Sequence, residues 1–142
     1  MKKDIDVLNN IYKIVDMGII GIDNVIMKIK DKCLEKIFID QKKEYNSIKI
    51  LALRLLNEYD ETAKGIGKMA EISSSAMTNM ELMKDDSDNN ITKMMIEGSN
   101  KGIIELQSIL NQKNIKNEQI INLAEELLKI LEHNIQDLKK YL

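Results

Sequence analysis

The side chains that could do chemistry in this chain are few, and the first set is a carboxylate pattern. In di-metal helical bundles, a glutamate and a histidine three residues apart share one helix face and grip one metal ion. Glu44 and Glu132 would be the glutamates here, but Ser47 and Ile135 stand where the histidines are required. The pattern therefore predicts a degenerate di-metal site at most, with Glu44 and Glu132 as its weak candidate ligands.

Methionines form the second set, because six of the nine fall in one stretch between Met69 and Met95. Met77, Met80 and Met83 are spaced by three, and thioethers at that spacing suit the soft ion Cu(I). Together with Met69 they could instead form an adaptable groove for a partner helix. A third interpretation is that they fill an irregular gap against the rest of the protein. All three remain open at the level of the sequence.

Gln41 and Glu44 lie on or beside the apolar face of a predicted helix, which makes them candidates for a polar pocket inside a bundle. The alternative is a pair at the edge of that face, half solvated or bonded to a neighbouring helix, because glutamate is rarely buried without a partner.

Two further residues are weaker candidates. The single histidine, His133, lies two positions from both Leu131 and Ile135, so we expect it to point outward rather than toward a metal or phosphoryl site. The single cysteine, Cys33, has lysines nearby but no histidine close in sequence. Phosphate-binding loops, dinucleotide-binding fingerprints and serine nucleophile motifs are absent, so no catalytic residue is predicted.

The elements that must position these residues are helices. Apolar residues recur three and four positions apart along most of the chain, which is the period of one helix face. The pattern predicts four long helices and a short accessory helix in the middle connection, at 4–30, 34–62, 69–84 (short), 90–111 and 117–141. Short connections between the first pair and between the last pair favour an antiparallel four-helix bundle formed by one domain, residues 1–142.

The stretch 94–110 organises this arrangement. It carries Gly98 and Gly102, and a helical glycine costs about 1 kcal/mol relative to alanine, so we expect another backbone to pass close to both. The stretch 17–22, MGIIGI, is echoed by 101–106, KGIIEL. This echo predicts a chain built from two helical hairpins.

Composition excludes several classes of function. The chain has 142 residues, a net charge of −2, 4% aromatic residues and no proline. Nucleic-acid binding would need a basic face or stacking aromatics, so none is expected. No apolar run approaches the length that spans a membrane, no secretory signal is evident, and one cysteine excludes an internal disulfide framework. We expect a cytoplasmic protein.

The motifs MGIIGI, MMIEGSNKGI and LEHNIQDLKKYL together resemble the ferritin-like superfamily, particularly its small bacterial members. The resemblance covers nearly the whole chain and implies an antiparallel four-helix bundle. It does not carry over the superfamily's metal site, because the ligand positions are largely missing.

These observations predict a non-enzymatic bundle without a cofactor, acting through protein contacts. The partner would be a second copy of the chain, as in a dimer, or an unknown protein. The alternative is a ligand-binding or metal-binding bundle, either with a degenerate di-metal site or with copper bound by the methionine-rich segment.

Overall fold

The computed structural model describes residues 2–63, 82, 84–112 and 114–142, and the described residues form helices and connecting loops. The four long helices are α1 (Lys2–Val25), α2 (Lys32–Glu58), α4 (Asp88–Asn111) and α5 (Glu118–Leu138). Two short 3-10 helices, η1 (Ile26–Lys28) and η2 (Lys139–Tyr141), extend α1 and α5. The predicted all-α, four-helix architecture is confirmed.

The helix starts follow from local side-chain chemistry. Asp31, Ser87 and Asn117 have extended backbones, and each side chain accepts hydrogen bonds from backbone N–H groups of the first turn of the helix that follows. These groups have no partner inside a helix, so the caps fix where α2, α4 and α5 begin. At the other end of α2, Asp60 has a φ of 57°, a left-handed conformation that aspartate tolerates better than most residues.

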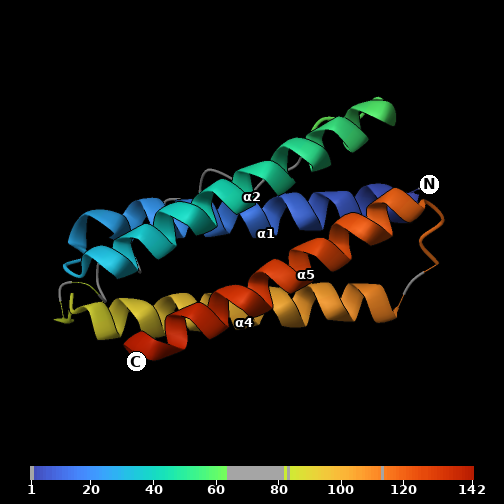
Figure 1. Ribbon diagram of the computed structural model, residues 1–142. Helices are drawn as coiled ribbons and strands as arrows, with labels where there is room; N and C mark the ends of the chain where they lie inside the picture. Colours follow the sequence, from blue (N-terminus) through green and yellow to red (C-terminus); the bar gives the residue numbers. More distant parts are fainter. Residues whose placement is uncertain (1, 64–81, 83, 113) are drawn as a thin grey trace.

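The helices pair into two antiparallel hairpins, α1 with α2 and α4 with α5, which pack against each other as a bundle (Figure 1). The two hairpins follow each other in the chain, and α2 and α4 run in the same direction. The chain between them therefore links opposite ends of the bundle. In antiparallel pairs joined by short loops, neighbouring apolar stripes face each other along their whole length.

A single apolar core runs between the four helices. Its largest fully buried side chains come from every helix: Leu8, Ile11 and Ile22 of α1, Leu34, Phe38 and Leu56 of α2, Ile91 and Leu106 of α4, and Ile120, Leu127 and Leu138 of α5. Ion pairs on the outside reinforce the α1–α2 hairpin, since Lys42 reaches Asp23 at 2.6 Å and Lys49 reaches Asp16 at 3.2 Å.

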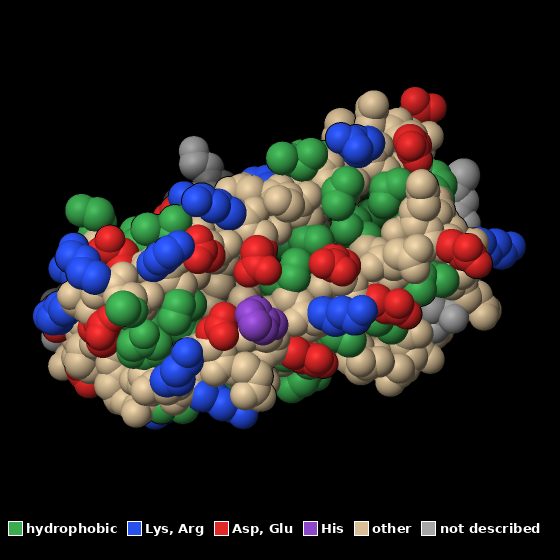
Figure 2. Space-filling model, in the orientation of Figure 1, with side chains coloured by type: hydrophobic (Ala, Val, Ile, Leu, Met, Phe, Trp, Pro, Cys, Tyr) green, Lys and Arg blue, Asp and Glu red, His purple; other side chains and the backbone are tan. Residues whose placement is uncertain are grey.

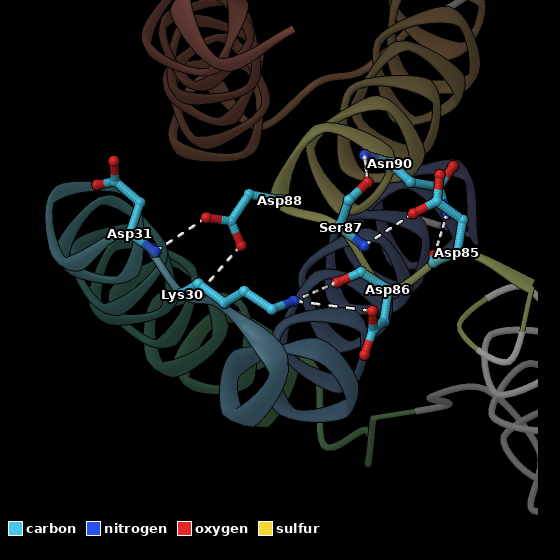
Figure 3. A network of polar contacts seen from close by, with 7 residues as sticks. All are labelled: Lys30, Asp31, Asp85, Asp86, Ser87, Asp88 and Asn90. Carbon is cyan, nitrogen blue, oxygen red and sulfur yellow. Dashed lines mark hydrogen bonds and ion pairs between the residues drawn. The ribbon is translucent and has the colours of Figure 1, made fainter.

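An aspartate at the start of each hairpin holds the turn of the other hairpin. Both carboxylate oxygens of Asp88, in the first turn of α4, accept backbone N–H groups of the α1–α2 turn, from Lys30 and Asp31, each at 2.9 Å (Figure 3). At the opposite end, Asp4 of α1 accepts the backbone N–H of Lys116 in the α4–α5 turn at 3.2 Å. These reciprocal contacts, which we call the aspartate latches, fasten each end of the bundle.

The two hairpins also resemble each other near their middles, where each has a glycine at the same distance from its first-turn aspartate. Gly18 lies fourteen residues after Asp4, and Gly102 lies fourteen residues after Asp88. A large side chain of the partner helix covers each glycine: the ring of Tyr45 from α2 over Gly18, and Leu131 from α5 over Gly102. The echo between 17–22 and 101–106 thus corresponds to matching places in two hairpins.

The structure differs from the sequence predictions in three places. The first α-helix ends at Val25, because the chain tightens into η1 before the Asp31 cap, and the second ends at Glu58, before Asp60. The prediction that another backbone passes close to Gly98 and Gly102 is wrong, since side chains of Ile14 and Leu131 approach Gly102 and nothing would lie within 4 Å of a Cβ at Gly98. Gly98 faces a more open part of the α1–α4 boundary.

The predicted accessory helix falls almost entirely outside the described residues. Of the stretch 69–84, only Leu82 and Lys84 are described, and Leu82 is buried. Met69, Met77, Met80 and Met83 all lie outside the described residues. The copper, partner-groove and gap-filling interpretations of these methionines therefore stay predictions.

Candidate functional site

Polar side chains of α2, α4 and α5 meet in one layer at the middle of the bundle. The Tyr45 hydroxyl accepts a hydrogen bond from Asn134 Nδ2 at 3.1 Å and also bonds with the Ser99 side chain. All three residues are buried, with Tyr45 at 3% and Asn134 at 1% exposure. Burial raises the pKa of the Tyr45 hydroxyl, so it stays protonated and neutral.

This central layer is neutral. Three-residue spacing on α2 and α5 places Tyr45 with Ile48 and Leu131 with Asn134 on the core-facing sides, and α1 contributes Gly18. None of these side chains is a carboxylate or an imidazole, the ligand types that hard and intermediate metal ions require. Within the described residues, no three histidine, cysteine or acidic side chains group closely enough to hold a metal ion.

Among the residues that the structure describes, three buried polar atoms have no described hydrogen-bond partner: Gln41 Nε2, Asn134 Oδ1 and Thr92 Oγ1. Buried polar atoms are paired in the great majority of cases, because leaving one without a partner costs about 1–3 kcal/mol. Gln41 lies one turn before Tyr45 on α2, and Asn134 donates to the Tyr45 hydroxyl. The donor Gln41 Nε2 and the acceptor Asn134 Oδ1, both without a described partner, therefore belong to residues at or next to the Tyr45–Asn134 hydrogen bond.

A groove between α1 and α4 reaches the edge of this layer. Its volume is about 410 Å³, and the described residues that line it are mostly small or apolar. Tyr45 and Ser99 line its inner side, and Lys13, Lys101 and Glu105 supply its charged groups. Gly18 and Gly21 of the first echoed stretch, Gly102 of the second, and Gly98 one turn before it line the groove and present no side chain to it.

Glu44 and Gln41, the two predicted pocket residues, separate in the structure. Gln41 is buried at 2% exposure, whereas Glu44 is half-buried and close enough to His133 of α5 to interact electrostatically. Partial burial raises the pKa of Glu44; the His133 charge lowers it, and the acidic residues Asp137, Asp40 and Glu126 raise it again. Neither Gln41 nor Glu44 is among the described residues that line the α1–α4 groove.

The remaining candidates lie on the surface. His133 is 68% exposed in its side chain, and its Nε2 lies 3.2 Å from Asp137 one turn later, so its partner is a surface carboxylate (Figure 2). Glu132 and Cys33 are exposed. The structure thus brings Glu44 near His133 but does not join Glu132 to them in a metal-binding group.

Sequence reasoning did not single out Tyr45, Ser99 or Asn134 as a site. The available signal was weak, since Asn134 lies three residues after the apolar Leu131 and directly before the apolar Ile135, beside an apolar helix face.

Comparison with known proteins decides the fold. One solved structure, described as a dodecameric thioferritin, the bacterioferritin-related protein from Bacteroides fragilis, superposes with a TM-score of 0.77 and 14% sequence identity, over 99% of this chain and 84% of that chain. The fold is ferritin-like. No family model and no curated protein sequence matches the chain. This ferritin-like bundle has, in its described part, no helix long and apolar enough to cross a membrane.

Proposed function

We propose that this chain is a non-enzymatic ferritin-like bundle, one four-helix domain, that works by associating with further copies of itself. The observation that carries the proposal is an uncovered apolar face on α2. Half of the large hydrophobic side chains that are exposed in the described part of the chain belong to this helix: Ile39, Ile50, Leu51 and Leu53.

The position of these side chains on α2 matters more than their number. Ile39, Ile50 and Leu53 point to the side opposite the core residues Ile48 and Ala52, by the period of the helix. They are 40%, 58% and 39% exposed, and hydrophobic side chains reach the surface over α2 (Figure 2). Scattered apolar residues are normal on a surface, but several on one outward face favour a protein contact.

Two further observations agree with this proposal. The central layer of the described bundle holds neutral groups where a di-metal enzyme needs carboxylates and histidines. The structurally similar thioferritin is described as a dodecamer, so this bundle shape is compatible with assembly into larger particles.

Sedimentation velocity over a wide concentration series tests the proposal, together with elemental analysis of protein purified without chelators. We expect a defined oligomer and no stoichiometric iron, manganese or copper. A strictly monomeric protein at the highest attainable concentration would overturn self-association. Stoichiometric iron or manganese would instead favour a metal-binding bundle, and copper would favour the predicted methionine site.

The α1–α4 groove supports a second candidate function, binding of a small and mostly apolar ligand. Its volume of about 410 Å³ lies in the range of ligand pockets, and it combines an apolar lining with the Tyr45 and Ser99 hydroxyl groups. A fluorescent apolar probe that binds the native protein, and is displaced when Gly98→Phe fills the open space there, would support this function. Unchanged binding in the variant would place the probe elsewhere.

A further inference from the structure

The outward face of α2 is self-complementary in charge. A line of exposed residues three or four positions apart runs along it: Lys36, Asp40, Lys43, Ser47, Leu51, Arg54 and Glu58. Residues at this spacing share one side of a helix. We call this line the α2 stripe. It has a cation and an anion at each end, and a small residue in its middle.

The order of the charges is what an antiparallel pair of identical helices requires. Asp40 and Arg54 lie seven residues on either side of Ser47, and Lys36 and Glu58 lie eleven residues on either side. If two copies of α2 cross antiparallel with Ser47 at the two-fold axis, residues equally far from Ser47 face each other. Asp40 then meets Arg54 of the second copy and Lys36 meets its Glu58, and each of these opposite-charge pairs occurs twice.

The remaining positions of the stripe fit the same register. Lys43 and Leu51 lie four residues on either side of Ser47, so the aliphatic stem of each lysine covers the partner copy's leucine. Ile50 and Ile39 are exposed and, by the period of the helix, lie beside the stripe on one side, where they add apolar area to the contact. Ser47 is small, which permits close approach at the axis, and its Oγ donates to the Lys43 carbonyl at 3.1 Å, so its hydroxyl is already satisfied when buried.

We infer that a second copy of this chain docks on α2 in an antiparallel, two-fold contact centred on Ser47, held by Asp40–Arg54 and Lys36–Glu58 pairs between copies. This inference rests on the proposed self-association and specifies its surface and register. The contact is isologous, so it closes a dimer and leaves the rest of the surface available for further assembly.

A charge exchange tests the register. Asp40→Arg and Arg54→Asp each place like charges opposite each other twice in one dimer, and we expect each to weaken dimerisation about tenfold or more. The double variant restores opposite charges, so its dissociation constant should return to within about threefold of the original. Lys129→Glu, at an exposed position of α5, is the matched control and should leave the constant unchanged.

Crosslinking gives an independent measurement that tolerates weak binding. In a Cys33→Ser background, which removes the exposed native thiol, Ser47→Cys places two thiols at the axis, and mild oxidation should yield a disulfide-linked dimer. Asn122→Cys, at an exposed position of α5, should not. The α2 register is wrong if neither single charge reversal changes the dissociation constant, or if the double variant does not regain the original constant. Self-association itself would still stand in either case. A monomeric native protein overturns both.

Discussion

Gly18 of α1 lies directly under the ring of Tyr45, so that a Cβ on the glycine would come within 2.8 Å of the Tyr45 Cε2 atom. Because Asn134 and Ser99 hold the tyrosine hydroxyl, the ring cannot swing aside without breaking buried hydrogen bonds. The closeness of α1 and α2 at this level therefore depends on one missing methyl group.

Substituting that glycine should force the first hairpin apart. We expect Gly18→Ala to lower the free energy of unfolding by about 1–3 kcal/mol, because overpacking outweighs the gain in helix propensity. Gly98→Ala is the matched control: nothing lies within 4 Å of its Cβ, so the same change should stabilise by up to about 1 kcal/mol. Urea unfolding of both variants measures the contrast, and equal shifts would contradict it.

The hydrogen bond between Tyr45 and Asn134 should show strong coupling. Tyr45→Phe leaves the buried Asn134 amide without its partner, and we expect a loss of about 1–3 kcal/mol of stability. Adding Asn134→Leu removes the amide as well, so the double variant should cost less than the two single changes summed. A double-mutant cycle by denaturant unfolding measures the coupling energy, which would be near zero if the bond contributes nothing.

The aspartate latches should differ in strength because their surroundings differ. Asp4 is 3% exposed and accepts from both the Tyr59 hydroxyl and the Lys116 backbone, whereas the Asp88 bonds are open to water. We expect Asp4→Asn to cost about 1–3 kcal/mol and Asp88→Asn less than about 1 kcal/mol. Thermal and urea unfolding of both variants test this order, and the reverse order would show that exposure does not decide it.

Glu44 should make stability fall as pH rises. Its pKa is raised in the folded protein, so the folded state keeps the proton to higher pH than the unfolded chain does. Stability from this group is present at acid pH and is lost between the ordinary glutamate pKa and the raised one. Glu44→Gln should therefore stabilise at neutral pH, by no more than about 0.5 kcal/mol because the site is half exposed.

The advantage of Glu44→Gln should vanish at a pH below the ordinary glutamate range, where Glu44 is protonated in both states. Urea unfolding as a function of pH measures it, with the exposed Glu132→Gln as the comparison. A stabilisation that stays constant at every pH would show that the effect is packing rather than titration.

Local features of this fold were readable from the sequence. The apolar periods predicted all four long helices, and capping chemistry explains the starts at Asn117 and Ser87, since both depend only on neighbouring residues. The ferritin-like bundle was also predicted, and the structural comparison confirms it. The end of α1 was placed too late, because the apolar stripe continues through Ile29 after the α-helix has become η1.

The contacts at the centre of the bundle could not be predicted from the sequence in the same way. Tyr45 and Asn134 are 89 residues apart, and no local pattern states that they meet. Gly98 and Gly102 have the same local context, one turn apart, yet only Gly102 is covered, because coverage depends on Ile14 and Leu131 from two other helices. Helical period identifies a face but not the side chains that will lie across from it.

The aspartate latches also bear on how the molecule is divided. Each hairpin carries, in its own first turn, the carboxylate that accepts hydrogen bonds from the turn of the other, and most of the described buried side chains belong to the four long helices. The hydrogen-bonding groups that join the two hairpins at their ends are thus carried by the hairpins themselves. Two separately synthesised peptides, one for each hairpin, would retain every one of these groups and should reassemble into the same four-helix arrangement.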